Sequence, residues 1–246
     1  MNEEEKKSGQ EEEILPGESG EESAEKRRKS RITFDVKMEK IQSVLKLSMN
    51  NPLLLQPLQS FGYTAKQFRE ALKKTRGVAK LHGEQKDLQA RQHEATRIAL
   101  QKREIANDTY MRILKTCRLA FPGDTELTYK LRLSGRRRHS FGGWIAQVTS
   151  FYQTILEDPK TVAELARYNI PRELLETGLE QALAAERASD FQVSTLGDAQ
   201  NATDMKNRAF KGLAGWVRDY QNVADVAFKK APHLRKEINI PISYLK

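Results

Sequence analysis

Several features that commonly define a fold or a cellular compartment are missing from this sequence. It has one cysteine, Cys117, which excludes an internal disulfide framework. No apolar run approaches the roughly 20 residues that a membrane-spanning helix needs. The acidic N-terminus lacks the basic and then apolar pattern of a secretory signal. We therefore expect a cytoplasmic protein without a membrane span.

Recognisable catalytic and cofactor-binding motifs are also absent. The four histidines do not form the Glu-x-x-His pattern of di-iron bundles, and with a single cysteine they do not match standard zinc-ligand spacing. The sequence has no Gly-x-x-x-x-Gly-Lys loop for phosphate. We interpret Cys117 as a core residue, because no histidine is near it in the sequence. The sequence thus predicts a non-enzymatic protein without cofactor or metal, a site assembled across helices being the enzymatic alternative.

Charge is distributed unevenly along the chain. Residues 1–25 contain ten glutamates and two lysines, a net charge of −8, so the rest of a chain with net charge +9 carries +17. Apart from Met1, residues 1–31 have Ile14 and Leu15 as their only sizeable apolar side chains, too few to offset the entropy lost on ordering. We predict a disordered acidic tail over residues 1–31 and a basic body after it.

The body contains two long stretches with the pattern of amphipathic helices. Residues 64–121 have no proline, and a continuous helix of that length would extend about 87 Å. Such a helix either folds back, near residue 83, or packs against a partner of equal length. Residues 172–231 supply that partner, with a weak point of their own at 190–198. The apolar or small residues at helical spacing in the first stretch are Phe68, Leu72, Thr75, Ala79, Ala95, Ile98 or Ala99, Ala106, Tyr110, Ile113, Cys117 and Phe121.

A shorter helix is predicted before each long one. Thr33 and Ser140 are N-cap residues, and Pro52 and Pro159 end the two helices that follow them. An irregular segment follows Phe121, and an extended one closes the chain. The second short helix should bury one apolar face, formed by Phe141, Trp144, Ile145, Val148, Phe151, Tyr152 and Ile155.

The two halves of the body are related by a shift of 107 residues without any gap. Caps, helix-ending prolines and terminal apolar positions coincide, as in Thr33 with Ser140 and Pro52 with Pro159. We predict an all-α fold, an elongated helical bundle or coiled coil built from a tandem duplication. The predicted domains are the tail (1–31), helical unit 1 (32–134) and helical unit 2 (135–246), with the two units packed as one bundle about a pseudo-two-fold axis.

Part of the second unit resembles a known group of proteins. The residues concerned are the run Gly197-Asp198-Ala199-Gln200-Asn201-Ala202-Thr203, then Arg208, Trp216 and Asp219-Tyr220. This pattern resembles that of uncharacterised bacterial helical-bundle proteins, in which an Ala-Gln-x-Ala-Thr run is followed by Trp and by Asp with an aromatic residue. The resemblance implies a duplicated helical bundle and implies no activity.

Two functional hypotheses follow from these observations. The first is a non-enzymatic scaffold or adaptor that binds another macromolecule, an unknown protein partner being favoured. The alternative is a nucleic-acid- or polyanion-associated basic helical protein, suggested by the +17 body. Acidic residues interleave with the basic ones, and no helix-turn-helix, zinc-finger or RNA-recognition pattern is present. We therefore rank this alternative below the adaptor hypothesis. A homo-oligomer is a further open alternative.

The candidate site is an anion-binding site made of basic residues before the first helix of each unit. The shift of 107 places Lys29 and Arg31 over Arg136 and Arg138, with Arg137 between the latter two. Unpaired N–H groups at a helix start attract anions, and arginine donates hydrogen bonds to phosphate or carboxylate. The competing interpretation is that these residues keep a connector soluble or pair with the acidic tail.

Overall fold

The computed structural model of the protein describes residues 32–135, 138 and 140–246, and these form helices and turns without a strand. The all-α prediction is therefore confirmed for this part of the chain. The predicted tail, residues 1–31, lies outside the described residues. None of the described helices combines the length and the apolar character that crossing a membrane requires.

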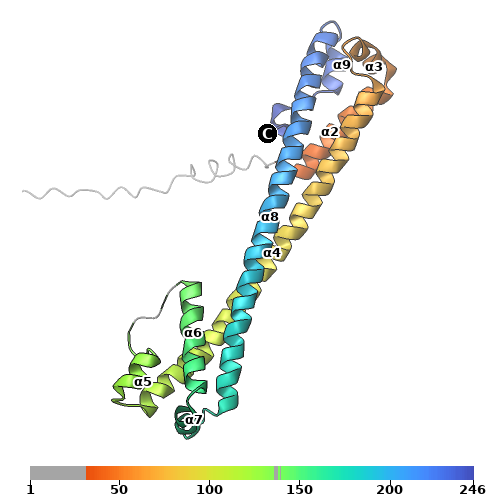
Figure 1. Ribbon diagram of the computed structural model, residues 1–246. Coiled ribbons are helices and arrows are strands. Elements are labelled where there is room, and N and C mark those ends of the chain that lie inside the picture. The colour runs from red at the N-terminus through yellow and green to blue at the C-terminus, as the bar shows by residue number, and fades with distance from the viewer. Residues whose placement is uncertain (1–31, 136–137, 139) are drawn as a thin grey trace, which may run out of the picture.

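Two continuous helices of 56 residues form the long axis of the molecule. They are α4 (Ala65–Ala120) and α8 (Arg172–Ala227), which run antiparallel side by side (Figure 1). Each extends about 84 Å at 1.5 Å per residue. The sequence had left open whether these stretches fold back, and neither does. Near the middle, the side chains buried along the seam between the helices are small or polar: Gln85, Ala95, Thr195, Ala199 and Ala202.

Short helices pack at the two ends of this pair (Figure 1). At one end, the α2 end, lie α2 (Phe34–Asn50), α3 (Pro52–Gln59) and α9 (Pro232–Glu237), followed by the 3-10 turn η1 (Ile242–Tyr244). At the other, the α6 end, lie α5 (Thr125–Lys130), α6 (Phe141–Leu156) and α7 (Pro159–Ala166). Each end therefore combines the start of one long helix with the end of the other.

Side-chain caps begin these helices, as the sequence predicts. The Thr33 hydroxyl accepts a hydrogen bond from the Val36 amide at 3.4 Å, and the Ser140 hydroxyl accepts one from the Gly143 amide at 3.3 Å. Such a bond pairs an amide that the helix itself leaves free. Pro52 and Pro159 occupy the first turn of α3 and α7, where a missing N–H costs nothing.

The hydrophobic core is divided into two clusters, one at each end. The α2-end cluster takes side chains from α2, α3, the start of α4, the end of α8 and residues 228–245. The α6-end cluster takes them from the end of α4, residues 131–133, α6, α7 and the start of α8. Both predicted units thus contribute to both clusters, and the middle of the α4–α8 pair connects them.

Most of the predicted buried faces agree with the structure. In α6, the residues from Trp144 to Ile155 that were expected inside are buried, and Phe141 is half-buried. Ala79 is a wrong prediction: it is exposed, and Val78 is buried instead. The segment after Phe121, expected to be irregular, contains α5 because the Asp124 carboxylate accepts from the Leu127 amide and caps a helical turn.

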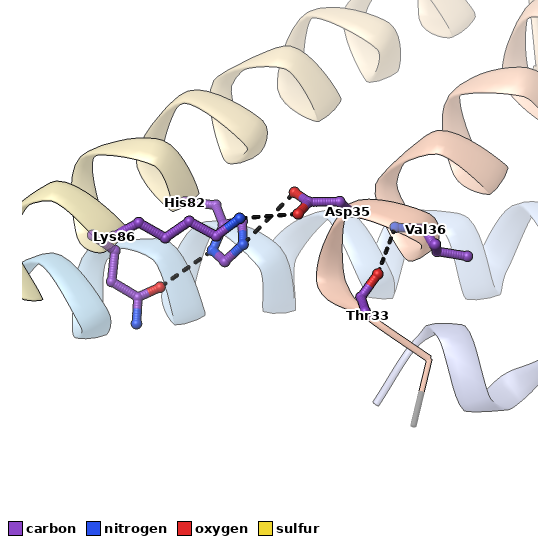
Figure 2. A network of polar contacts seen from close by, with 6 residues as sticks. Thr33, Asp35, Val36, His82 and Lys86 are labelled. Carbon is purple, nitrogen blue, oxygen red and sulfur yellow. Dashed lines mark hydrogen bonds and ion pairs between the residues drawn. The ribbon is translucent and has the colours of Figure 1, made fainter. Parts of the chain in front are cut away.

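A polar network fastens the first turn of α2 to the middle of α4 (Figure 2). Asp35 Oδ2 accepts a hydrogen bond from Lys86 Nζ at 2.9 Å, and Asp35 Oδ1 lies 3.7 Å from His82 Nε2. The hydrogen bond from Lys86 is the main cause of a lowered pKa for the Asp35 carboxyl, which is therefore charged at neutral pH. The Phe34 ring packs on the His82 ring with a centroid distance of 4.4 Å. These contacts fix the direction of α2 along the pair.

Candidate anion-binding site

Of the five predicted anion-binding residues, Arg138 is placed by the structure. Lys29, Arg31, Arg136 and Arg137 lie outside the described residues. Arg138 lines a pocket between the connection that follows α5 and one face of α6. This pocket is therefore the candidate site.

One wall of the pocket is the segment after α5, residues 131–133, in which buried and exposed side chains alternate. Leu131 and Leu133 are buried in the α6-end core and hold the segment against the body. Arg132, between them, is exposed and has a φ of 49°, which turns the chain in the left-handed region. The Arg118 side chain donates from Nε to the Leu133 carbonyl at 2.6 Å. Leu131 and Leu133 therefore anchor the segment and hold Arg132 at the surface between them.

Gln147 fixes the opposite wall. Its side chain is buried, and its amide Nε2 donates to the Tyr110 hydroxyl at 3.2 Å. Its carbonyl oxygen accepts a hydrogen bond from the Arg138 backbone amide, also at 3.2 Å. Because both ends of the Gln147 amide are bonded, the backbone of Arg138 is held next to α6.

Between these walls lies an open pocket of about 470 Å³ with a strongly basic lining. Among the described residues, three of its lining side chains are cationic and none is acidic. A smaller hollow of about 170 Å³ shares the same three cations. The lining residues are Thr128, Tyr129, Lys130, Arg132, Ser134, Arg138, Gln147 and Ser150. Such a lining can attract an anion and donate hydrogen bonds to it.

Lys130 has an acidic neighbour outside the lining. Its ammonium group forms an ion pair with Glu126 one helical turn earlier. The hydrogen bond to Glu126 raises the pKa of Lys130, so this cation stays charged at neutral pH. Both partners are largely exposed, so water screens the pair and the Lys130 charge is only partly neutralised.

Sequence reasoning found Arg138 and missed the other side chains of this pocket. Lys130 and Arg132 lie before the predicted basic cluster, in a segment expected to be irregular. The signal that could have found them is the run Leu131-Arg132-Leu133, in which apolar anchors alternate with a cation. The residues 107 positions after Lys130 and Arg132 are Glu237 and Asn239, so these two cations are not repeated at that shift.

Other candidate sites offer less chemistry. Cys117 is buried, and desolvation raises the pKa of its thiol to about 12, so it carries no thiolate at neutral pH. Within the described residues, no group of three or more His, Cys, Asp or Glu side chains is arranged so that it could hold a metal ion. His82 is engaged in the contacts that fasten α2.

Comparison with protein-family models, with curated proteins and with solved structures gave no match to this chain. The resemblance to bacterial duplicated helical bundles therefore stays a prediction from residues 197–220.

Proposed function

We propose that the protein is a non-enzymatic helical scaffold or adaptor that presents binding surfaces at two separated ends. The observation that carries this proposal is the architecture: two continuous 56-residue helices connect two separate hydrophobic cores. A pair of helices about 84 Å long keeps the two ends apart at a fixed distance. Such a rod suits a protein that spaces partners, and we propose an antiparallel coiled coil for its middle.

We further propose that the two ends are built by a tandem duplication, which would give the adaptor two related surfaces. The bounds of α4, α3 and α5 recur 107 residues later as those of α8, α7 and α9. The left-handed residues after α3 and α7, Gly62 and Asn169, also differ by 107. Buried positions of α2 have buried counterparts in α6 at the same shift: Met38 with Ile145, Ile41 with Val148, Val44 with Phe151, Leu45 with Tyr152, and Ser48 with Ile155.

Exposed apolar side chains at matched positions favour binding at both ends. Leu119 is exposed near the end of α4, and Val226, 107 residues later, is exposed near the end of α8. Phe61 and Tyr168 are an exposed aromatic pair with the same spacing. Val226 and Phe61 belong to the α2 end, whereas Leu119 and Tyr168 belong to the α6 end. Exposed apolar groups of this kind are common at interaction surfaces.

The adaptor proposal is tested by capture with variants of one end at a time. Tagged full-length protein is cross-linked in its native cells, purified, and its protein partners are quantified by mass spectrometry. We expect Leu119→Glu to lose the partners of the α6 end and Val226→Glu to lose those of the α2 end. Each variant is the matched control of the other, because both place a carboxylate at an exposed position of a long helix. Equal capture by both variants and the wild type would contradict a two-ended adaptor.

A second candidate function, association with nucleic acid or another polyanion, is favoured by the pocket of Lys130, Arg132 and Arg138. The net charge of +17 outside residues 1–25 acts in the same direction. We expect retention on a heparin column at physiological salt. Deleting residues 1–25, with their charge of −8, should raise the salt concentration of elution because it removes a competing anion. Flow-through of the deleted protein at about 50 mM salt would contradict this function.

The remaining proposals concern cell biology and assembly. We place the protein in the cytoplasm, and we keep an unknown protein partner as the first expected ligand. A homo-oligomer would be a form of the same adaptor function, since it would use the same exposed ends. Sedimentation velocity of the purified protein at several concentrations distinguishes a monomeric rod from an assembly.

A further inference from the structure

We propose that the basic pocket between α5 and α6 binds a nucleotide unit of single-stranded nucleic acid. The backbone phosphate is held by Lys130, Arg132 and Arg138, and the base stacks on Tyr129. This inference rests on the second proposed function and deepens it by naming the ligand class and the side chains that contact it.

The phosphate is recognised by charge and by donor geometry. Arg132 and Arg138 supply planar guanidinium groups, which donate two parallel hydrogen bonds to phosphate oxygens, and Lys130 supplies a point charge. Hydroxyl groups of Thr128, Ser134 and Ser150 also line the pocket, where they add neutral donors. Among the described residues no carboxylate lines the pocket, and Glu126, the ion-pair partner of Lys130, lies outside the lining.

The base is recognised by Tyr129. Packing within the protein does not explain an exposed tyrosine at this position. Tyr129 is 85% exposed, the most exposed large hydrophobic side chain among the described residues. It belongs to neither hydrophobic cluster, yet it lines the pocket beside Lys130. Aromatic rings next to a basic groove are the stacking surfaces of single-strand-binding proteins, because every base has a flat face. An exposed tyrosine at the rim of three cations matches this arrangement.

The size of the pocket favours an unpaired strand over a duplex. A volume of about 470 Å³ falls in the range of sites that enclose a small molecule or one nucleotide. Stacking on Tyr129 also requires a base that is free of its partner strand, since the face of a paired base is covered by its neighbours. The ligand is therefore a single strand, with one nucleotide in the pocket and flanking phosphates on the basic surface.

Fluorescence anisotropy with a labelled single-stranded oligothymidylate of about 12 nucleotides tests the proposal on the full chain. We expect Tyr129→Ala to weaken binding by about 5- to 100-fold, the usual effect of losing one stacked base. Phe191→Ala is the matched control, because Phe191 is an exposed aromatic side chain of α8 outside the pocket lining. Wild-type affinity of Tyr129→Ala would overturn the proposal.

The phosphate contacts are tested by the salt dependence of the same binding reaction. The double variant Arg132→Gln/Arg138→Gln should reduce the log–log salt slope by about 1.4, or 0.7 for each lost contact to a single strand. The control Arg69→Gln/Lys73→Gln removes the same charge from exposed positions of α4 at the α2 end and should change the slope little. Equal changes of the salt slope in both double variants would overturn the proposal that this pocket binds a single strand. Tighter binding of a duplex of the same length would also overturn it.

Retention on heparin distinguishes a failure of the pocket proposal from a failure of the proposed polyanion function. If wild-type protein is retained on heparin and the Arg132→Gln/Arg138→Gln variant binds oligothymidylate as the wild type does, the pocket is overturned and the polyanion function stands. If the tail-deleted protein does not bind heparin at low salt, the proposed function itself is wrong.

Discussion

Replacing Trp144 by alanine is expected to lower the free energy of unfolding by about 3–5 kcal/mol, the usual cost of deleting a large buried aromatic side chain. Trp144 is 4% exposed in the α6-end core. Its indole Nε1 donates to Asn107 Oδ1 at 3.2 Å, and the Arg103 guanidinium lies 5.5 Å from its ring. The truncation therefore leaves a cavity, removes the hydrogen bond to Asn107 and removes one of the two aromatic rings, Phe141 and Trp144, beside the Arg103 guanidinium. Urea unfolding followed by circular dichroism measures the loss.

Tyr129→Ala is the control for this measurement. Tyr129 lies outside both cores and is exposed, so its truncation should change the free energy of unfolding by less than about 0.5 kcal/mol. A loss below about 1 kcal/mol for Trp144→Ala would show that the indole is not part of the core. Trp144 would then become a candidate binding residue.

Local signals made the helices of the body predictable. The hydroxyls of Thr33 and Ser140, and the prolines that follow the first helices, act through bonds within a few residues, so they can be identified without knowledge of the fold. The apolar face of α6 was correctly assigned for the same reason. Ala79 was misassigned because Val78 and Ala79 both fit the helical period, and packing against the other helix decides between them.

The long helices are continuous because their middle parts pack against each other, and the local sequence there gives no signal of this packing. Residues 82–94 are polar and contain Gly83, which is compatible with a break. In the structure, the Gln85 side chain donates to the Thr203 hydroxyl across the pair at 3.2 Å, and Ala95 is buried. A polar and small-residue seam is thus covered by a partner more than 100 residues away. The sequence predicts residues 172–231 as the partner, but no local pattern shows that the polar middle of the stretch stays helical.

The candidate site was only partly predictable for a similar reason. Arg138 was identified because it precedes a helix cap. The pocket, however, arises because Leu131 and Leu133 enter the α6-end core and because Gln147 binds the Arg138 amide. Each of these contacts joins segments separated in the sequence, so Lys130 and Arg132 could be placed next to Arg138 only with the fold in hand.

The second large effect is expected at Gly178, in α8 beneath α6. A Cβ atom at this position would lie 2.4 Å from Cζ and 2.4 Å from the hydroxyl oxygen of Tyr152, a side chain that is itself fully buried. Alanine favours a helix over glycine by about 1 kcal/mol, whereas overpacking a core costs about 1–3 kcal/mol. We therefore expect Gly178→Ala to destabilise the protein by up to about 2 kcal/mol in urea unfolding. Gly197→Ala, in the same helix with nothing within 4 Å, should instead stabilise it by about 0.5–1 kcal/mol.

The other end of the molecule suggests how the Gly178→Ala variant can be rescued. Residues 107 positions before Gly178 and Tyr152 are Ala71 and Leu45, both buried in the α2-end core. Leucine there leaves room for the methyl group of alanine. The Tyr152 hydroxyl is buried without a hydrogen-bond partner among the described residues, so replacing this tyrosine removes no hydrogen bond. In a double-mutant cycle, Tyr152→Leu should cost at least about 1 kcal/mol less in the Gly178→Ala background than in the wild type. Additive effects, or a Gly178→Ala protein as stable as Gly197→Ala, would contradict both the tight contact and the proposed equivalence of the two ends.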